Sequence, residues 1–169
     1  MLKINFRSDS DLNDYSRAIS EYEEIWQLSG HKIVELLEKH ACLKFKESEI
    51  NAIVYRGISR SHPLSLRDNQ DNERKRLILI HELGHRLLAG QVAGGKSANS
   101  LQTHKLLFLI LHDVFVEFGG REFADSAVEW DSKLPRPEYG EAWRWALDIE
   151  PERRKEKFLE VVRFGYGTI

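Results

Sequence analysis

The feature that most constrains the fold of this 169-residue chain is the stretch from Arg74 to Leu88, which is apolar on nearly every side of a helix. A helix of this kind is buried inside a protein. Amide and carboxylate side chains between Asp68 and Glu73 are suited to its start, and Gly90 is suited to its end. The sequence therefore predicts a buried central helix around which the rest of the chain folds.

Length and composition indicate a single globular domain, residues 1–169, in a reducing compartment. The chain is 41% apolar and 31% charged, and its net charge of −2 argues against a protein that coats nucleic acid or anionic lipid. The single cysteine, Cys42, excludes a disulfide scaffold and a thiolate zinc site. Neither a signal peptide nor the roughly 20 consecutive apolar residues of a membrane span are present. We therefore expect a cytoplasmic protein with no membrane partner.

Periodicity along the rest of the chain predicts a mostly helical α+β domain with a short sheet. Period-two alternation predicts strands at residues 2–6, 43–46 and 50–55, with a polar connection over 56–72. Helical spacing predicts two helices on either side of Ser29-Gly30, the first from Leu12 to Trp26 and the second over 33–40. A strongly apolar helix is predicted over 101–118, with a pattern that continues toward residue 130. After a linker at Pro135 and Pro137, helices over 138–147 and 151–164 form a C-terminal helical extension of about residues 138–169.

The buried central helix contains the motif His81-Glu82-Leu83-Gly84-His85. Histidines at positions i and i+4 lie about 40° apart on one helix face, so both imidazoles can reach one ion. Glu82 lies about 100° from His81, beside such an ion, where it can accept a proton from water. Neutral imidazoles with an oxygen ligand suit Zn²⁺, and catalytic zinc keeps three protein ligands and an open position. The motif supplies two ligands and a base.

Two explanations fit these polar residues in an apolar helix. Histidine and glutamate are costly to bury unless they are paired or bound to something. A metal site is one explanation. The other is a hydrogen-bonded pair of core histidines with a salt-bridged glutamate.

The next apolar helix offers candidates for a third ligand. Asp113 and Glu117 lie at i and i+4, and two carboxylates on one buried face repel each other unless a cation or donors separate them. We assign Glu117 as the third ligand, with Asp113 as a hydrogen-bond partner of a ligand imidazole. The reverse assignment, with Asp113 on the metal, stays open because spacing alone does not separate the two. His112 is expected in the core or an interface. His104 is expected at the surface or as a cap, or else as a donor to a developing oxyanion.

On His81, Glu82, His85 and Glu117 the chain resembles the zincin metallopeptidases of the gluzincin branch, in which a glutamate on a downstream helix completes the site. The segment Glu117-Phe-Gly-Gly-Arg-Glu-Phe-Ala is similar to the Glu-x5-Phe-Ala helix of the ImmA/IrrE family, and the resemblance covers residues 50–128. It implies a small zincin-like domain with zinc as cofactor and a peptide or protein as substrate. It also implies a sheet whose edge strand precedes the active-site helix, a place that residues 50–55 fit. Such an edge binds an extended peptide by strand addition.

The leading hypothesis is a zinc-dependent metallopeptidase, a hydrolase that cleaves peptide bonds with zinc-activated water and Glu82 as general base. The alternative is a non-enzymatic regulatory or binding domain that retains a structural or sensing zinc site. A closed site would account for the same residues without turnover.

Overall fold

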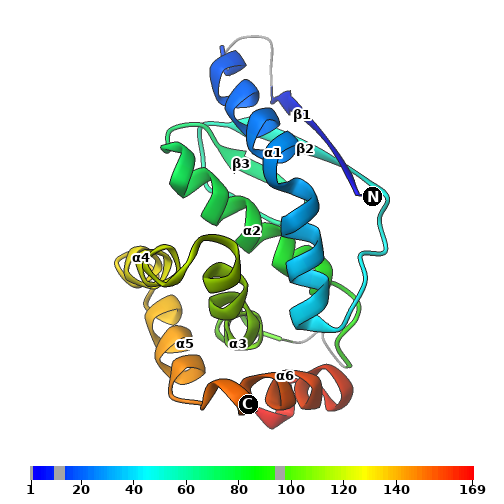
Figure 1. The fold of residues 1–169 in the computed structure, drawn as a ribbon, viewed down its shortest axis with the longest axis vertical. Coiled ribbons are helices and arrows are strands. Elements are labelled where there is room, and N and C mark those ends of the chain that lie inside the picture. The colour runs from blue at the N-terminus through cyan, green and yellow to red at the C-terminus, as the bar shows by residue number, and fades with distance from the viewer. Residues whose placement is uncertain (1, 10–13, 94–97) are drawn as a thin grey trace. The chain divides into compact units, whose positions relative to one another are not determined.

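The computed structural model describes residues 2–9, 14–93 and 98–169, and it is mostly helical with a short three-stranded sheet (Figure 1). This confirms the predicted α+β class. In chain order the elements are β1 Lys3–Ser8, α1 Ser16–Ala41, β2 Glu49–Tyr55, β3 Ser65–Arg67, α2 Asn72–Leu88, α3 Ser100–Gly119, α4 Arg121–Ser132, α5 Pro137–Leu147, α6 Pro151–Phe164 and a final 3-10 turn, Tyr166–Thr168.

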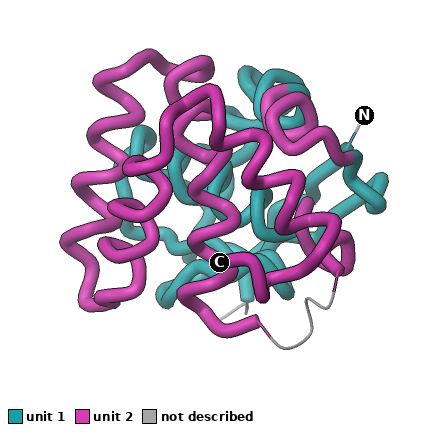
Figure 2. Tube along the Cα trace, turned by 90° about the horizontal axis from the view of Figure 1, so that it is seen from below, with its two compact units in different colours: residues 1–35, 44–86 teal, residues 36–43, 87–169 magenta. Residues whose placement is uncertain are grey.

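The chain divides into two compact units, shown in different colours in Figure 2. Unit 1 comprises residues 1–35 and 44–86, and unit 2 comprises residues 36–43 and 87–169. Helices α1 and α2 each contribute residues to both units. The single zincin-like domain expected from the sequence stays a prediction.

The sheet of unit 1 is parallel throughout, in the order β1-β2-β3. Alternate residues of β2 (Ile50, Ala52 and Val54) are buried, which confirms the predicted strand at 50–55. Its predicted place at the edge of the sheet is wrong, because β2 lies between the other two strands. The edge strand that precedes α2 is β3, within the predicted polar connection 56–72. Three residues are too few to show an alternating pattern.

A buried ion pair holds the helices of unit 1 together. Lys75 on α2 is only 1% exposed, and its ammonium group is paired with the Glu21 carboxylate on α1. The Lys75 Nζ also lies 5.3 Å from the ring centroid of Tyr22, a fully buried residue. Tyr22 stacks on Phe6 of β1 with ring centroids 5.9 Å apart. An ammonium group can be this deeply buried only when it is paired, so Glu21 fixes how α1 and α2 pack within the unit.

Helix α1 is continuous, so the break predicted at Ser29-Gly30 is wrong. A Cβ atom at Gly30 would lie 2.6 Å from Cδ2 of the Trp26 indole. The glycine therefore makes room for a tryptophan that packs across the next helical turn, and it does not end the helix. Leu12, the first residue of the predicted pattern, lies outside the described residues.

The strand predicted at residues 43–46 is also wrong, because these residues form no strand. Helix α1 ends at Ala41, and Cys42 follows in the left-handed region with φ of +53°. That turn directs residues 43–46 away from the helix axis, and an alternating pattern forms a strand only where a neighbouring strand pairs with it.

In unit 2, helix α3 packs against α4, α5 and α6. Its run from Leu106 to Leu111 is buried, and Phe108 stacks on Trp143 of α5 with ring centroids 3.9 Å apart. The predicted helices at 101–118, 138–147 and 151–164 are confirmed, but the continuation toward residue 130 is a separate helix. Gly120, with φ of +90°, separates α3 from α4.

The helix starts follow the predicted chemistry in part. Asp71 accepts a hydrogen bond from the Arg74 amide at 2.8 Å, which caps α2 as expected. Pro151 is the first residue of α6, as predicted, whereas Pro137 begins α5 and does not belong to a linker. The predicted small-residue loop 90–100 lies partly outside the described residues, at 94–97.

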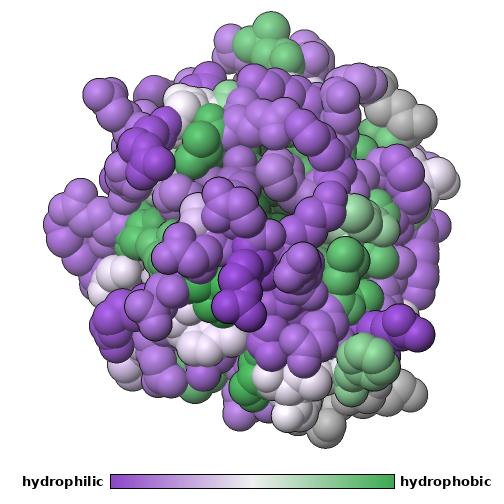
Figure 3. Space-filling model, turned by 60° about the horizontal axis from the view of Figure 1, so that its bottom comes forward, coloured by the Kyte–Doolittle hydropathy of each residue, from purple (hydrophilic) through white to green (hydrophobic). Residues whose placement is uncertain are grey.

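Among the described residues, no helix has the length and apolar character needed to cross a membrane. On the face drawn in Figure 3, hydrophilic residues predominate and hydrophobic residues form separate small groups. Scattered hydrophobic residues of this kind are normal on a protein surface.

We predict that Glu21→Gln lowers the free energy of unfolding by about 3 kcal/mol, because it leaves the Lys75 charge buried without a carboxylate. The Lys75 hydrogen bond holds the pKa of Glu21 below its usual range. The loss of unfolding free energy in Glu21→Gln is therefore greatest above the ordinary glutamate pKa. It disappears as the pH falls through the lowered pKa of Glu21, because the wild-type carboxylate is then protonated too. Urea unfolding at several pH values measures it.

The matched control is Arg17→Gln, which removes the other cation on Glu21. Arg17 is 93% exposed, so this change should cost less than about 0.5 kcal/mol. Equal effects of the two variants would contradict the role given to burial.

Candidate functional site

Helix α2 brings the two histidines of the motif together. The Nε2 atoms of His81 and His85 lie 3.2 Å apart, and His81 is buried. Two nitrogens bound to one zinc at roughly 2.05 Å with tetrahedral angles lie about 3.3 Å apart. The pair therefore fits the spacing of two ligands on one ion, as the i, i+4 spacing predicts.

Glu82 follows His81 on the next position of α2 and is half-buried. It lies about 100° around the helix from His81, beside the pair of imidazoles. Its negative charge acts on the buried Tyr22 side chain. Burial raises the pKa of Tyr22, and the charges of Asp68, Glu82 and Glu21 add to that effect.

His104 is placed differently from the prediction. It was expected at the surface or as a cap, but it is only 6% exposed, near the start of α3. Its Nδ1 donates to the Ser100 carbonyl oxygen at 2.7 Å, and its ring packs on Tyr139 with centroids 4.2 Å apart. A carbonyl oxygen only accepts, so the neutral ring carries its proton on Nδ1 and its lone pair on Nε2. Burial lowers the pKa of His104, which favours this neutral form.

Three buried or half-buried histidines are possible metal ligands. His81 and His85 of unit 1 and His104 of unit 2 each offer one ring nitrogen. Among the described residues, this group includes neither Glu117 nor Asp113.

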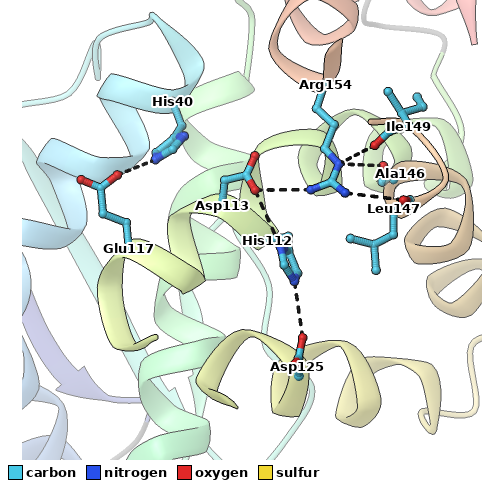
Figure 4. A network of polar contacts seen from close by, with 9 residues as sticks. All are labelled: His40, His112, Asp113, Glu117, Asp125, Ala146, Leu147, Ile149 and Arg154. Carbon is cyan, nitrogen blue, oxygen red and sulfur yellow. Dashed lines mark hydrogen bonds and ion pairs between the residues drawn. The ribbon is translucent and has the colours of Figure 1, made fainter. Parts of the chain in front are cut away.

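Glu117 has two partners in unit 2. Its carboxylate accepts a hydrogen bond from Lys39 Nζ at 2.6 Å. It also lies 3.0 Å from His40 Nε2, the contact drawn in Figure 4. It is exposed, so the sequence was wrong to place it on a buried helix face. The hydrogen bonds from Lys39 and His40 hold the pKa of the Glu117 carboxyl below its usual range. Its assignment as a metal ligand stays a prediction.

Asp113 belongs to a second polar network, also drawn in Figure 4. Its Oδ1 accepts from Nη1 of the buried Arg154 at 3.3 Å and lies 3.7 Å from Nδ1 of His112. The His112 Nε2 lies 3.6 Å from Asp125 Oδ1. His112 is 7% exposed, which confirms it as a core residue. Asp113 as a partner of a ligand imidazole, or as a ligand itself, stays a prediction.

The sequence held a signal for His104 that helical spacing makes visible. Phe108 and Leu111 lie four and seven residues after it, and both are fully buried. Positions i, i+4 and i+7 share one helix face, so His104 lies on the core face of α3. Its position near the helix start suggested a cap, but the apolar face was the stronger indication.

Comparison with known proteins finds no match to this chain, whether among protein-family models, curated proteins or solved structures.

We predict that Lys39→Met raises the pKa of the Glu117 carboxyl toward its ordinary value, because the substitution removes the larger cause of its lowering. The pKa is read from an NMR titration of the glutamate side-chain carbons. Lys133→Met is the control, because Lys133 is paired with Glu129 and should leave the Glu117 titration unchanged. An unchanged Glu117 pKa in Lys39→Met would contradict the observed contact.

Proposed function

We propose that this protein is a zinc-dependent metallopeptidase whose metal is held on α2. The observation that carries the proposal is the 3.2 Å separation of the His81 and His85 Nε2 atoms, with Glu82 beside them on the same helix. A tetrahedral zinc site requires that spacing. The carboxylate of Glu82, directly after His81, supplies the base that a metallopeptidase needs, and this supports the peptidase over a hydrogen-bonded pair of core histidines.

We assign the third ligand to His104. It is buried, and it is the third histidine that offers a ring nitrogen as a possible metal ligand. The hydrogen bond from Nδ1 to the Ser100 carbonyl fixes the tautomer, so that Nε2 holds the lone pair. Metal-ligating histidines typically donate their other ring N–H to a carbonyl or carboxylate in this way. Three neutral imidazoles with no thiolate form a ligand set found in catalytic zinc enzymes.

The chemistry follows from the ligands and the base. Zinc, when bound, acts as a Lewis acid that polarises a carbonyl and makes a water molecule more acidic. Glu82 accepts a proton from the attacking water and delivers it to the leaving amine, so that one water is consumed for each peptide bond cleaved. Glu82 is half-buried and lies about 100° around α2 from His81, which supports a role in carrying this proton without ligating the metal.

We predict that the purified protein carries close to one zinc per chain and cleaves peptides, and that Glu82→Gln keeps the zinc but lowers the cleavage rate by about 10²- to 10⁴-fold. The amide has nearly the shape of the carboxylate but accepts no proton at neutral pH. Zinc is measured by elemental analysis, and cleavage by mass spectrometry of a peptide-library digest.

His81→Ala should lose the zinc, whereas His31→Ala, which changes an exposed histidine of α1, should keep it. A wild-type protein without zinc, indistinguishable from His81→Ala, would overturn the proposal. Full zinc occupancy with no cleavage by wild type would favour the regulatory or binding domain instead.

A separate prediction concerns the third ligand. His104→Ala should weaken zinc binding by at least about 100-fold, because it removes a donor from the ion, whereas Glu117→Gln should leave zinc binding unchanged. Competition with a chromogenic chelator measures both affinities. The opposite result would assign the third position to Glu117.

A further inference from the structure

The outer edge of β3 is the edge of the sheet nearest in sequence to α2, and its main-chain groups already have partners within unit 1. Residues Ser65 and Arg67 direct their backbone N–H and C=O groups away from β2, because Leu66 and Asp68 face it. The Ser65 amide donates to the Arg60 carbonyl at 2.8 Å, and the Arg60 amide donates to the Ser65 carbonyl at 2.9 Å. This pair is antiparallel.

The backbone groups of Arg67, the next residue of β3 that directs them outward, also have hydrogen-bond partners. The Arg67 amide donates to Ser59 Oγ at 3.1 Å, and the Arg67 carbonyl accepts from the Tyr22 hydroxyl at 3.0 Å. Residues 58–60, which we call the arm, thus provide three of the four partners of this edge. The arm lies against β3 as an added antiparallel strand does.

Hydrogen bonds hold the arm in place, with little apolar burial. Ile58 is 50% exposed, and its carbonyl accepts from the Tyr55 hydroxyl at 2.5 Å. Beyond the arm, Nη1 of Arg86 donates to the Ser61 carbonyl at 2.5 Å, and the Arg86 guanidinium is paired with Glu47. Arg86 directly follows His85 on α2, so this contact links the end of the arm to the helix that carries the metal ligands.

These contacts can be exchanged at small cost. An extended polypeptide placed on β3 would offer Ser65 a backbone donor and acceptor, as Arg60 does now, and would offer the Arg67 amide a carbonyl in place of the Ser59 hydroxyl. Hydrogen bonds exchanged one for one change the free energy little. Since the arm buries little apolar surface, its displacement forfeits little hydrophobic stabilisation.

We propose that the arm occupies the place of an extended polypeptide substrate on β3, so that the substrate pairs with this edge, antiparallel to it, only after the arm has moved away. This inference rests on the proposed peptidase function and adds its substrate class and its regulation. The substrate is an unstructured chain segment held by main-chain pairing. The arm competes with it for the edge and so slows the cleavage of short generic peptides.

The test compares a double variant that removes two hydrogen-bonding groups of the arm with a single variant that keeps both. Ser59→Ala with Arg60→Pro removes the hydroxyl acceptor and the Arg60 amide donor, whereas Arg60→Ala keeps both. With zinc content unchanged, kcat/KM on a library of unstructured decapeptides should rise about tenfold or more in the first variant, the factor expected from losing one or two hydrogen bonds. Arg60→Ala should remain at the wild-type value.

A second measurement needs neither zinc nor turnover. Hydrogen exchange at the Ser65 and Arg67 amides is recorded in proteins that all carry Glu82→Gln. It should be slow when the arm is unchanged, faster when the arm carries the double substitution, and slow again when the decapeptides are added to that variant. An arm variant that neither cleaves faster nor regains protection with peptide overturns the proposal. If the double variant fails to fold, Ser59→Ala alone is measured at the Arg67 amide. Missing zinc in wild type counts against the peptidase function, while the exchange result still decides the role of the arm.

Discussion

The structure of unit 1 depends on one constraint, the need to neutralise a lysine that is buried on α2. Lys75 is 1% exposed, and an ammonium group at that depth is tolerated only with a carboxylate at its head. Glu21 supplies it, which fixes the rotation of α2 about its own axis. Seven residues bring a helix back to within about 20° of the same direction, so Lys75 and Glu82 share a face. His81 and His85 both lie to one side of that face, about 100° and 60° from Glu82. The placement of the candidate base thus follows from an ion pair two turns away.

How much could be predicted from the sequence depends on how local each feature is. The spacing of His81 and His85 follows from helical geometry alone, and the 3.2 Å contact agrees with the prediction. The burial of His104 was misjudged because it is decided by Phe108, Tyr139 and the packing of α5 on α3, which no short motif encodes. Gly30 was misread for a similar reason, since only the position of the Trp26 indole explains it.

The two carboxylates of α3 show what a sequence argument can and cannot supply. The sequence argument was that Asp113 and Glu117 repel each other unless a cation or donors lie between them. In unit 2 each carboxylate has a cation of its own: Lys39 pairs with Glu117 and Arg154 with Asp113, from 78 and 41 residues away along the chain. Periodicity identifies a polar residue on an apolar helix, but it does not identify a partner at such a separation. A metal ion and a distant cationic side chain can both neutralise a carboxylate, and only the three-dimensional structure shows which of the two does so.

Arg154 also affects the order in which the helices of unit 2 can fold. Its guanidinium donates to the carbonyl oxygens of Ala146, Leu147 and Ile149 at the end of α5, and to Asp113 on α3. These acceptors are buried or half-buried, and each precedes its donor in the sequence. During synthesis from the N-terminus, α3 and α5 therefore emerge before the residue that satisfies them. Unit 2 therefore completes its buried hydrogen bonds only after α6 has been synthesised. In a chain whose synthesis has paused before residue 154, these carbonyl oxygens and Asp113 would lack their guanidinium donor.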